Sequence, residues 1–150
     1  MGNIKVIVIS HRGNIGGPNH SLENNPEQIK KAFSAGYNVE VDVWLIKDRI
    51  YLGHDKPEYE VDLKFLKNEK LWCHAKNISA LQYLILHNVH CFWHQTDDVV
   101  LTSKGFMWTY PGKELTYNSI CVMPEISSYT DIEFKRASGV CTDYPERYKQ

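Results

Sequence analysis

Apolar residues along the chain form two kinds of segment that alternate. Residues 4–10 are a nearly continuous β-branched run, and residues 38–46 place apolar side chains with the period of two that is typical of strands. Between them, Asn25-Pro26-Glu27 predicts the start of a helix that ends near Gly36, because Asn caps helices and Pro suits their first turn. The same patterns predict further strands at 50–52, 70–76, 89–94, 99–101, 106–109, 119–123 and 139–142, and helices at 62–68 and 79–87.

This alternation of strands and helices predicts an α/β fold with a mostly parallel sheet. The chain of 150 residues has the length of one domain, and no linker or internal repeat divides residues 1–150. Residues 95–125 offer strands with little helical periodicity. We therefore expect that the second half of the fold lacks helices.

Composition excludes several classes of protein. Hydrophobic residues make up 43% of the chain, which argues against disorder, and no apolar run is long enough to span a bilayer. The net charge of −1 gives no electrostatic reason to expect nucleic acid or an anionic membrane as a partner. The first residues lack the pattern of an export signal, and the four cysteines lack Cys-x-x-Cys spacing, so we expect buried, reduced thiols and a cytoplasmic protein.

Polar residues collect where the predicted strands end. Glu40, Asp42 and Trp44 share one face of their strand, and His74 and Lys76 share one face of another. Because the carboxyl ends of parallel strands meet at one rim, these side chains are expected to lie close together with His11-Arg12 and His54-Asp55.

The pair Glu40 and Asp42 lies in a strand otherwise made mainly of valine. Two buried carboxylates need a cation, and two carboxylates with open positions suit a hard divalent ion such as Mg²⁺ or Ca²⁺. The structural alternative is an ion pair of these carboxylates with Arg12 and Lys76.

The order of these residues resembles the glycerophosphodiester phosphodiesterase family. The matching motifs are His11-Arg12-Gly13, Glu23-Asn24-Asn25, Glu40-x-Asp42, Gly53-His54-Asp55, Lys76 and Cys141-Thr142-Asp143-Tyr144-Pro145. The motifs are collinear and reach from residue 11 to residue 145. The resemblance implies a TIM-barrel-like fold and a phosphoric diester hydrolase that acts on a small glycerophosphodiester-like substrate.

The resemblance also implies a role for each matched residue. His11 and His54 correspond to the acid/base pair, and Glu40 and Asp42 correspond to metal ligands. The remaining matched residues correspond to groups that meet the phosphate or support the site: Arg12, Lys76, Glu23 and Asn24. In such an enzyme a substrate hydroxyl attacks the phosphodiester, and water then opens the cyclic phosphate. Two imidazoles that titrate near neutral pH suit the base and acid roles. Trp44 is a candidate for stacking on the substrate, or else a core residue.

Two features depart from the family pattern. His74 stands where the family has a third metal carboxylate, and an imidazole ligand adds Mn²⁺ to the candidate ions. A TIM barrel typically needs about 250 residues, so several outer helices must be reduced or missing in this chain. Glu125, at the end of another predicted strand, is a candidate replacement carboxylate.

Other functions remain open at this stage. One alternative is a lyase that stops at the cyclic phosphate, and another is a binding module for phosphoryl ligands without turnover. The helix-poor half also carries aromatic residues and a methionine, which favour a homodimer unless the rings fold inward and leave a monomer. These residues are Phe92, Trp93, Phe106, Met107, Trp108, Tyr110 and Tyr117.

Overall fold

The computed structural model describes residues 6–148, in which ten strands join in one curled sheet. The strands are β1 (Ile7–His11), β2 (Asn38–Ile46), β3 (Arg49–Leu52), β4 (Tyr59–Val61), β5 (Leu71–Ala75), β6 (Cys91–Phe92), β7 (Val99–Leu101), β8 (Met107–Thr109), β9 (Ser119–Val122) and β10 (Gly139–Thr142). The helices are α1 (Pro26–Ser34), α2 (Leu63–Leu66), α3 (Ile78–Leu86) and α4 (Asp131–Phe134), with short 3₁₀ turns at Pro124–Ile126 and Pro145–Tyr148.

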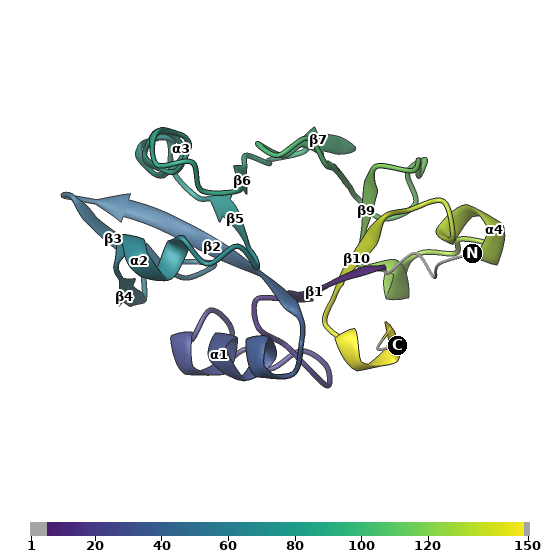
Figure 1. Cartoon of the computed structure of the whole chain (residues 1–150), viewed down its shortest axis with the longest axis horizontal. Helices are drawn as coiled ribbons and strands as arrows, with labels where there is room; N and C mark the ends of the chain where they lie inside the picture. The colour runs from purple at the N-terminus through teal and green to yellow at the C-terminus, as the bar shows by residue number, and fades with distance from the viewer. Residues whose placement is uncertain (1–5, 149–150) are drawn as a thin grey trace.

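The centre of the sheet is parallel. Its strands follow the order β6-β5-β2-β1-β10-β9-β8, so that the first strand of the chain pairs with the last. The sheet curls into a half-barrel, and Figure 1 shows β6 and β7 approaching one another above β1. Because all of these strands point the same way, their carboxyl ends lie at one rim.

Strand β2 is long enough for its two halves to pair with different strands. Its first half lies between β1 and β5, and its second half projects beyond β1 and pairs antiparallel with β3. Lys47 and Asp48 form the turn with φ of 50° and 66°, as a two-residue hairpin requires. This hairpin carries the chain back to residue 53 at the rim.

The two faces of the sheet bury different residues. Val39, Val41 and Val43 face outward and pack in one apolar cluster with residues of α1 and α3, such as Ile29 and Leu84. The inward face forms a second apolar cluster from Ile9, Trp72, Phe92, Trp108, Ile120, Val122 and Cys141. The inner cluster fills the concave side of the sheet below the rim, so the polar residues at the rim lie on top of apolar side chains.

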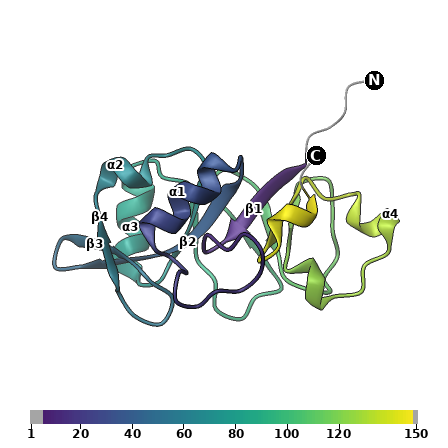
Figure 2. The same cartoon turned by 90° about the horizontal axis from the view of Figure 1, so that it is seen from below.

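Three of the helices, α1, α2 and α3, lie over one half of the sheet (Figures 1 and 2). Asn25 caps α1, with Pro26 at its first position, and Asn77 caps α3 through a hydrogen bond from the Ala80 amide. In Figure 2, α1, α2 and α3 lie with β1–β4, whereas the other half carries α4 and short turns. This distribution confirms a mixed α/β, barrel-like fold with few helices.

Most predicted elements are observed, with small changes at their ends. Residues 4 and 5 of the first predicted strand lie outside the described residues. The structure adds β4 and α4, and α4 has a Thr130-x-x-Glu133 capping box that the sequence reading did not use. All four cysteines are buried and free. Within residues 6–148, no helix has the length and apolar character needed to cross a membrane.

Candidate functional site

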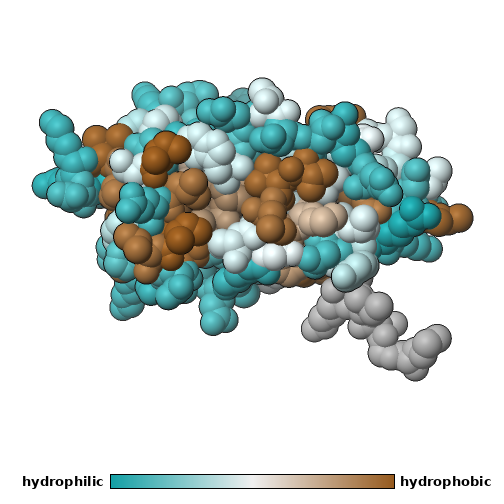
Figure 3. All heavy atoms as spheres, turned by 90° about the horizontal axis from the view of Figure 1, so that it is seen from above, coloured by the Kyte–Doolittle hydropathy of each residue, from teal (hydrophilic) through white to brown (hydrophobic). Residues whose placement is uncertain are grey.

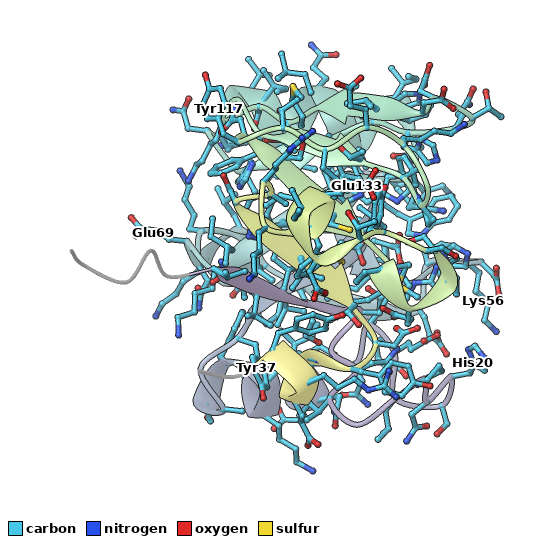
Figure 4. The ribbon with its side chains drawn as sticks, turned by 90° about the vertical axis from the view of Figure 1, so that its right-hand side faces the viewer. His20, Tyr37, Lys56, Glu69, Tyr117 and Glu133 are labelled. Carbon is cyan, nitrogen blue, oxygen red and sulfur yellow. The ribbon has the colours of Figure 1, made fainter. Side chains whose placement is uncertain are left out.

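The predicted site residues meet at the carboxyl end of the half-barrel. Figure 4 shows this end at its right-hand side, where His20 and Lys56 lie, while Glu69 lies at the opposite end. His11, Glu40 and His74 belong to β1, β2 and β5, which are joined in one parallel ladder. The rim therefore brings together side chains that are more than 60 residues apart in the sequence.

The loop after β1 needs an unusual backbone. Arg12 and Gly13 adopt φ of 57° and 88°, and Asn24 adopts 63°, all in the left-handed region. Backbone hydrogen bonds hold this shape, because the Arg12 amide donates to the Glu40 carbonyl and the Asn24 amide donates to the Arg12 carbonyl. Left-handed non-glycine residues are uncommon and cluster at functional sites, so this strained loop marks the rim as a candidate site.

Glu40 and Asp42 are the buried core of the site. Their exposed fractions are 3% and 1%, and Glu40 Oε1 and Asp42 Oδ1 have no hydrogen-bond partner among residues 6–148. Burial and the charge of Asp42 raise the pKa of Glu40. Burial works in the same direction on Asp42, but the neighbouring imidazoles of His54 and His74 and the Arg12 charge outweigh it, so its pKa is lowered. The pair thus carries uncompensated carboxylate oxygens in an interior where they are costly.

Asn24 holds Asp42 with both ends of its amide. Its Nδ2 donates to Asp42 Oδ2 at 3.0 Å, and its Oδ1 accepts from the Asp42 backbone N–H at 2.9 Å. The sequence analysis placed Asn24 among residues that meet the phosphate or support the site. The structure gives this buried amide a supporting contact, because it orients Asp42.

His74 lies against both carboxylates. Its Nδ1 is 3.2 Å from Asp42 Oδ1, and its ring stacks on Phe92 with centroids 5.1 Å apart. One atom from each of Glu40, Asp42 and His74 falls within 4.8 Å of the other two. The three residues that the sequence predicted as metal ligands therefore lie together.

His11 is held by a residue to which the sequence analysis gave no role. Its Nδ1 lies 2.7 Å from Asp143 Oδ1, and its Nε2 lies 3.9 Å from Glu40 Oε1. A carboxylate only accepts, so Nδ1 carries the proton and Nε2 faces the site. Burial opposes the charged imidazole, but Asp143 and Glu40 outweigh it and raise the pKa of His11. Asp143 therefore fixes which nitrogen of His11 can exchange a proton.

His54 lies on the other side of the carboxylate pair from His11, in the turn that follows β3. Its Nδ1 is 3.6 Å from Asp42 Oδ2 and 2.8 Å from Arg12 Nη2. Trp44 Nε1 donates to the Gly53 carbonyl at 2.7 Å. The indole N–H of Trp44 thus anchors the turn that carries His54. The sequence analysis considered a stacking role or a core role for Trp44 and did not predict this contact.

Arg12 joins the site to an adjacent cavity. Its Nε lies 3.4 Å from Asp42 Oδ2, and its Nη1 donates to Glu23 Oε1 at 3.4 Å. Asn14 Nδ2 lies within hydrogen-bond distance of both Glu23 and Asp143, at 2.8 and 2.9 Å. The cavity has a volume of about 470 Å³, and its lining is polar throughout: Arg12, His20, Glu23, Asn24, His54, Asp55, Lys56 and Glu58. It offers room for a small polar molecule next to His54.

The far side of the rim carries Lys76 and two stacked rings. Lys76 follows β5 and is half-buried, and no ion pair of Lys76 is found within residues 6–148. His94 stacks on Tyr110 with centroids 3.7 Å apart, and burial and the neighbouring His74 lower the pKa of His94. The contact of Lys76 with a phosphate therefore stays a prediction.

Glu125 does not belong to the carboxylate cluster. It accepts hydrogen bonds from the Thr142 hydroxyl at 2.9 Å and from the Asp143 amide at 3.2 Å. Thr142 faces away from the inner surface, so Glu125 braces the end of β10 from outside. The suggestion of a replacement metal carboxylate at this position is wrong.

The donor set fits a divalent cation. Two buried carboxylate oxygens have no hydrogen-bond partner within residues 6–148, and one donor atom each of Glu40, Asp42 and His74 lies within 4.8 Å of the other two. Carboxylate and imidazole donors are those that divalent ions take in proteins, and a cation would remove the repulsion between Glu40 and Asp42.

Comparisons of the chain with protein-family models, curated proteins and solved structures give no match.

Proposed function

We propose that this protein is a metal-dependent phosphodiesterase that cleaves a small phosphodiester by acid–base catalysis with two histidines. The observation that carries the proposal is the order of groups across the rim. His11 lies 3.9 Å from Glu40 and His54 lies 3.6 Å from Asp42, so a histidine flanks each end of a buried carboxylate pair. These four residues also belong to the motifs that resemble glycerophosphodiester phosphodiesterases, which supports the proposed activity.

The two histidines divide the proton transfers. His11 has its Nδ1–H engaged by Asp143, so its Nε2 is the atom that accepts a proton from an attacking hydroxyl of the substrate. His54, 40% exposed at its side chain and next to the polar cavity, donates a proton to the departing alcohol oxygen. The attack forms a new P–O bond, breaks the bond to the alcohol and leaves a cyclic phosphate. Water then opens the ring, with His54 as base and His11 as acid.

Positive groups bind and orient the phosphate. Arg12 projects between Asp42 and His54, and Lys76 follows directly after β5, the strand that carries His74. Hydrogen bonds from these two side chains would neutralise charge on the non-bridging oxygens, where it grows in the transition state. A divalent ion held by Glu40 and Asp42 would add Lewis-acid stabilisation of the same charge.

We also propose that the half-barrel is a shortened form of the TIM barrel. The pairing of β1 with β10 and the parallel order of the central strands support this, as does a site at their carboxyl ends. Helices are replaced by loops around β7–β9, which accounts for the short chain. Buried free thiols suit a reducing compartment, and we propose the cytoplasm.

Product analysis tests the proposed activity. The protein is incubated with a panel of phosphodiesters and Mg²⁺, Ca²⁺ or Mn²⁺, and the products are followed by ³¹P NMR. We expect a phosphomonoester with at least one small phosphodiester, and no reaction after exhaustive chelation. A cyclic phosphate that accumulates would identify a lyase instead. Binding of phosphodiesters without any product would identify a non-catalytic module and contradict the proposal.

A further inference from the structure

The orientation of the His74 ring indicates which class of metal ion the site binds best. Its Nε2 lies 3.4 Å from the carbonyl oxygen of His94. A carbonyl oxygen only accepts, so the ring proton belongs on Nε2. Nδ1 then carries the lone pair and lies 3.2 Å from Asp42 Oδ1, which has no hydrogen-bond partner in the described part of the chain.

A lone pair that faces a carboxylate oxygen at this distance is repulsive unless a cation lies beside both atoms. An imidazole that donates one N–H to a backbone carbonyl and presents the other nitrogen to a cluster of oxygens has the arrangement typical of metal-bound histidines. Parallel stacking on Phe92, with an angle of 8° between the rings, holds the imidazole in that orientation. The ring is therefore prepared to bind an ion.

The donor set decides between classes of ion. Ca²⁺ takes six to eight oxygen ligands and Mg²⁺ takes oxygen ligands in an octahedron, whereas imidazole is a good ligand for first-row transition ions. Of the three residues that converge here, one contributes nitrogen, and both carboxylates are buried, with Asn24 and Arg12 already around Asp42. No fourth carboxylate, histidine or cysteine of residues 6–148 joins this group, so the protein offers two carboxylates and one nitrogen.

We infer that Nδ1 of His74 is a metal ligand and that the site selects a first-row transition ion, such as Mn²⁺ or Co²⁺, over Ca²⁺ and Mg²⁺. This inference rests on the metal site of the proposed function and adds the class of ion that occupies it. It concerns binding only, so it can be tested with no phosphodiester present.

Pulsed electron paramagnetic resonance of bound Mn²⁺ detects the ligand directly. The protein is loaded with one equivalent of Mn²⁺, and the electron spin echo is examined for modulation by a coordinated ¹⁴N nucleus. We expect this modulation in the wild type and in His87→Ala, since His87 lies at the other end of α3 from the site. We expect it to be lost in His74→Asn, which removes the imidazole without adding a buried charge.

Calorimetric titration measures the selectivity. We expect Mn²⁺ to bind the wild type with at least about tenfold higher affinity than Ca²⁺ or Mg²⁺, and His74→Asp to reduce that ratio about 10- to 100-fold. Both variants are checked by circular dichroism, and the wild-type spectrum and ratio decide the question if a variant fails to fold. Absence of ¹⁴N modulation in the wild type overturns the inference, as does equal affinity for Ca²⁺. That result would indicate an imidazolium paired with Asp42.

These outcomes separate the inference from the proposed function. Phosphodiester turnover with Ca²⁺ or Mg²⁺ and no nitrogen ligand would leave the enzyme assignment intact and refute the choice of ion. Nitrogen-coordinated Mn²⁺ without turnover of any phosphodiester would support the inference and refute the activity.

Discussion

At the scale of single residues, the candidate site consists of buried charges that are incompletely neutralised. Glu40 and Asp42 are almost fully buried, and each retains an oxygen without a hydrogen-bond partner in residues 6–148. Such groups destabilise a fold unless they serve a ligand or a reaction. The surrounding residues restrict them, since Asn24 orients Asp42 while Asp143 orients His11.

The two histidines give the first prediction. His11→Ala and His54→Ala should each lower turnover of the best phosphodiester by at least about 100-fold, because each removes a proton-transfer group. His87→Ala, far from the rim at the end of α3, should leave turnover unchanged. Steady-state kinetics with thermal melting as a folding check measure this. Near-normal turnover in either rim variant would eliminate the two-histidine mechanism.

Asp143 gives the second prediction, as a positioning residue that acts through His11. Asp143→Asn keeps the size of the side chain but removes the charge that fixes the proton on Nδ1, so kcat should fall about tenfold or more while KM changes little. Metal affinity, measured by calorimetry, should remain that of the wild type. If kcat is unaffected, the 2.7 Å contact between His11 and Asp143 has no catalytic importance.

At the scale of elements, a hairpin places part of the site, and a seam of hydrogen bonds joins β6 to the segment before β8. The hairpin of β2 and β3 delivers His54 to the rim, and the indole of Trp44 holds its turn through the Gly53 carbonyl. The seam lies where β6 faces the segment before β8, with no ladder between them in residues 6–148. There the Ser103 amide donates to the Cys91 carbonyl at 2.8 Å, and His90 Nε2 lies 2.8 Å from Thr102 Oγ1.

Gly53 gives a prediction for the hairpin. A Cβ atom at this position would lie 1.9 Å from the Lys56 carbonyl oxygen, so the turn must shift in Gly53→Ala. We expect a loss of about 1–3 kcal/mol in the free energy of unfolding, with lower kcat because His54 moves. Gly16→Ala is the matched control, since a Cβ there meets no atom within 4 Å. Urea denaturation compares the two, and equal stabilities would show that the turn adapts freely.

His90 gives a prediction for the seam. Burial, with a smaller effect of Lys104, lowers the pKa of His90 from 6.5 to about 4. Between these values the unfolded chain binds a proton there that the native state does not, so this contribution to stability is complete above pH 6.5 and is lost as pH falls towards 4. Between pH 7 and pH 5 the wild type should lose about 1–2 kcal/mol more than His90→Gln. Urea denaturation at both pH values measures the difference, and identical losses would contradict the assignment.

At the scale of the whole molecule, the small number of helices affects which apolar side chains lie exposed at the surface. Phe92 and Trp108 fold inward and fill the half-barrel, as the monomer alternative supposed, whereas Tyr117 is 85% exposed. Figure 3 looks onto the face where α3 and β7 lie in Figure 1 and shows apolar side chains gathered on it. The exposed apolar residues of these two elements are Ile78, Ile85, Leu86, Val99 and Leu101.

The homodimer therefore stays a prediction, now attached to this face. Apolar surface of this kind is commonly covered by a second copy through a two-fold contact. Sedimentation equilibrium at micromolar concentration should give the mass of two chains, and Leu86→Lys with Leu101→Lys should shift it towards one. Ile132→Lys, on α4, is the control because Ile132 is equally exposed outside this face. A single-chain mass across the concentration range would exclude the dimer.

Local pattern in the sequence determined most elements and the rim residues. The caps of α1 and α3, the period of two in β2 and the turn at Lys47-Asp48 depend on neighbours within a few residues. The inward face of β2 could thus be read directly, because strand geometry alone places alternate side chains on one side.

Tertiary structure alone decided which groups restrain the site. His11 and Asp143 are 132 residues apart and meet because β1 pairs with β10, a parallel pairing that no local pattern encodes. The use of Trp44 to anchor Gly53 and of Glu125 to brace β10 depends on how separate strands stack and curl. Contacts of this kind arise from packing between distant segments, so the sequence indicated the residues of the candidate site but not the residues that hold them.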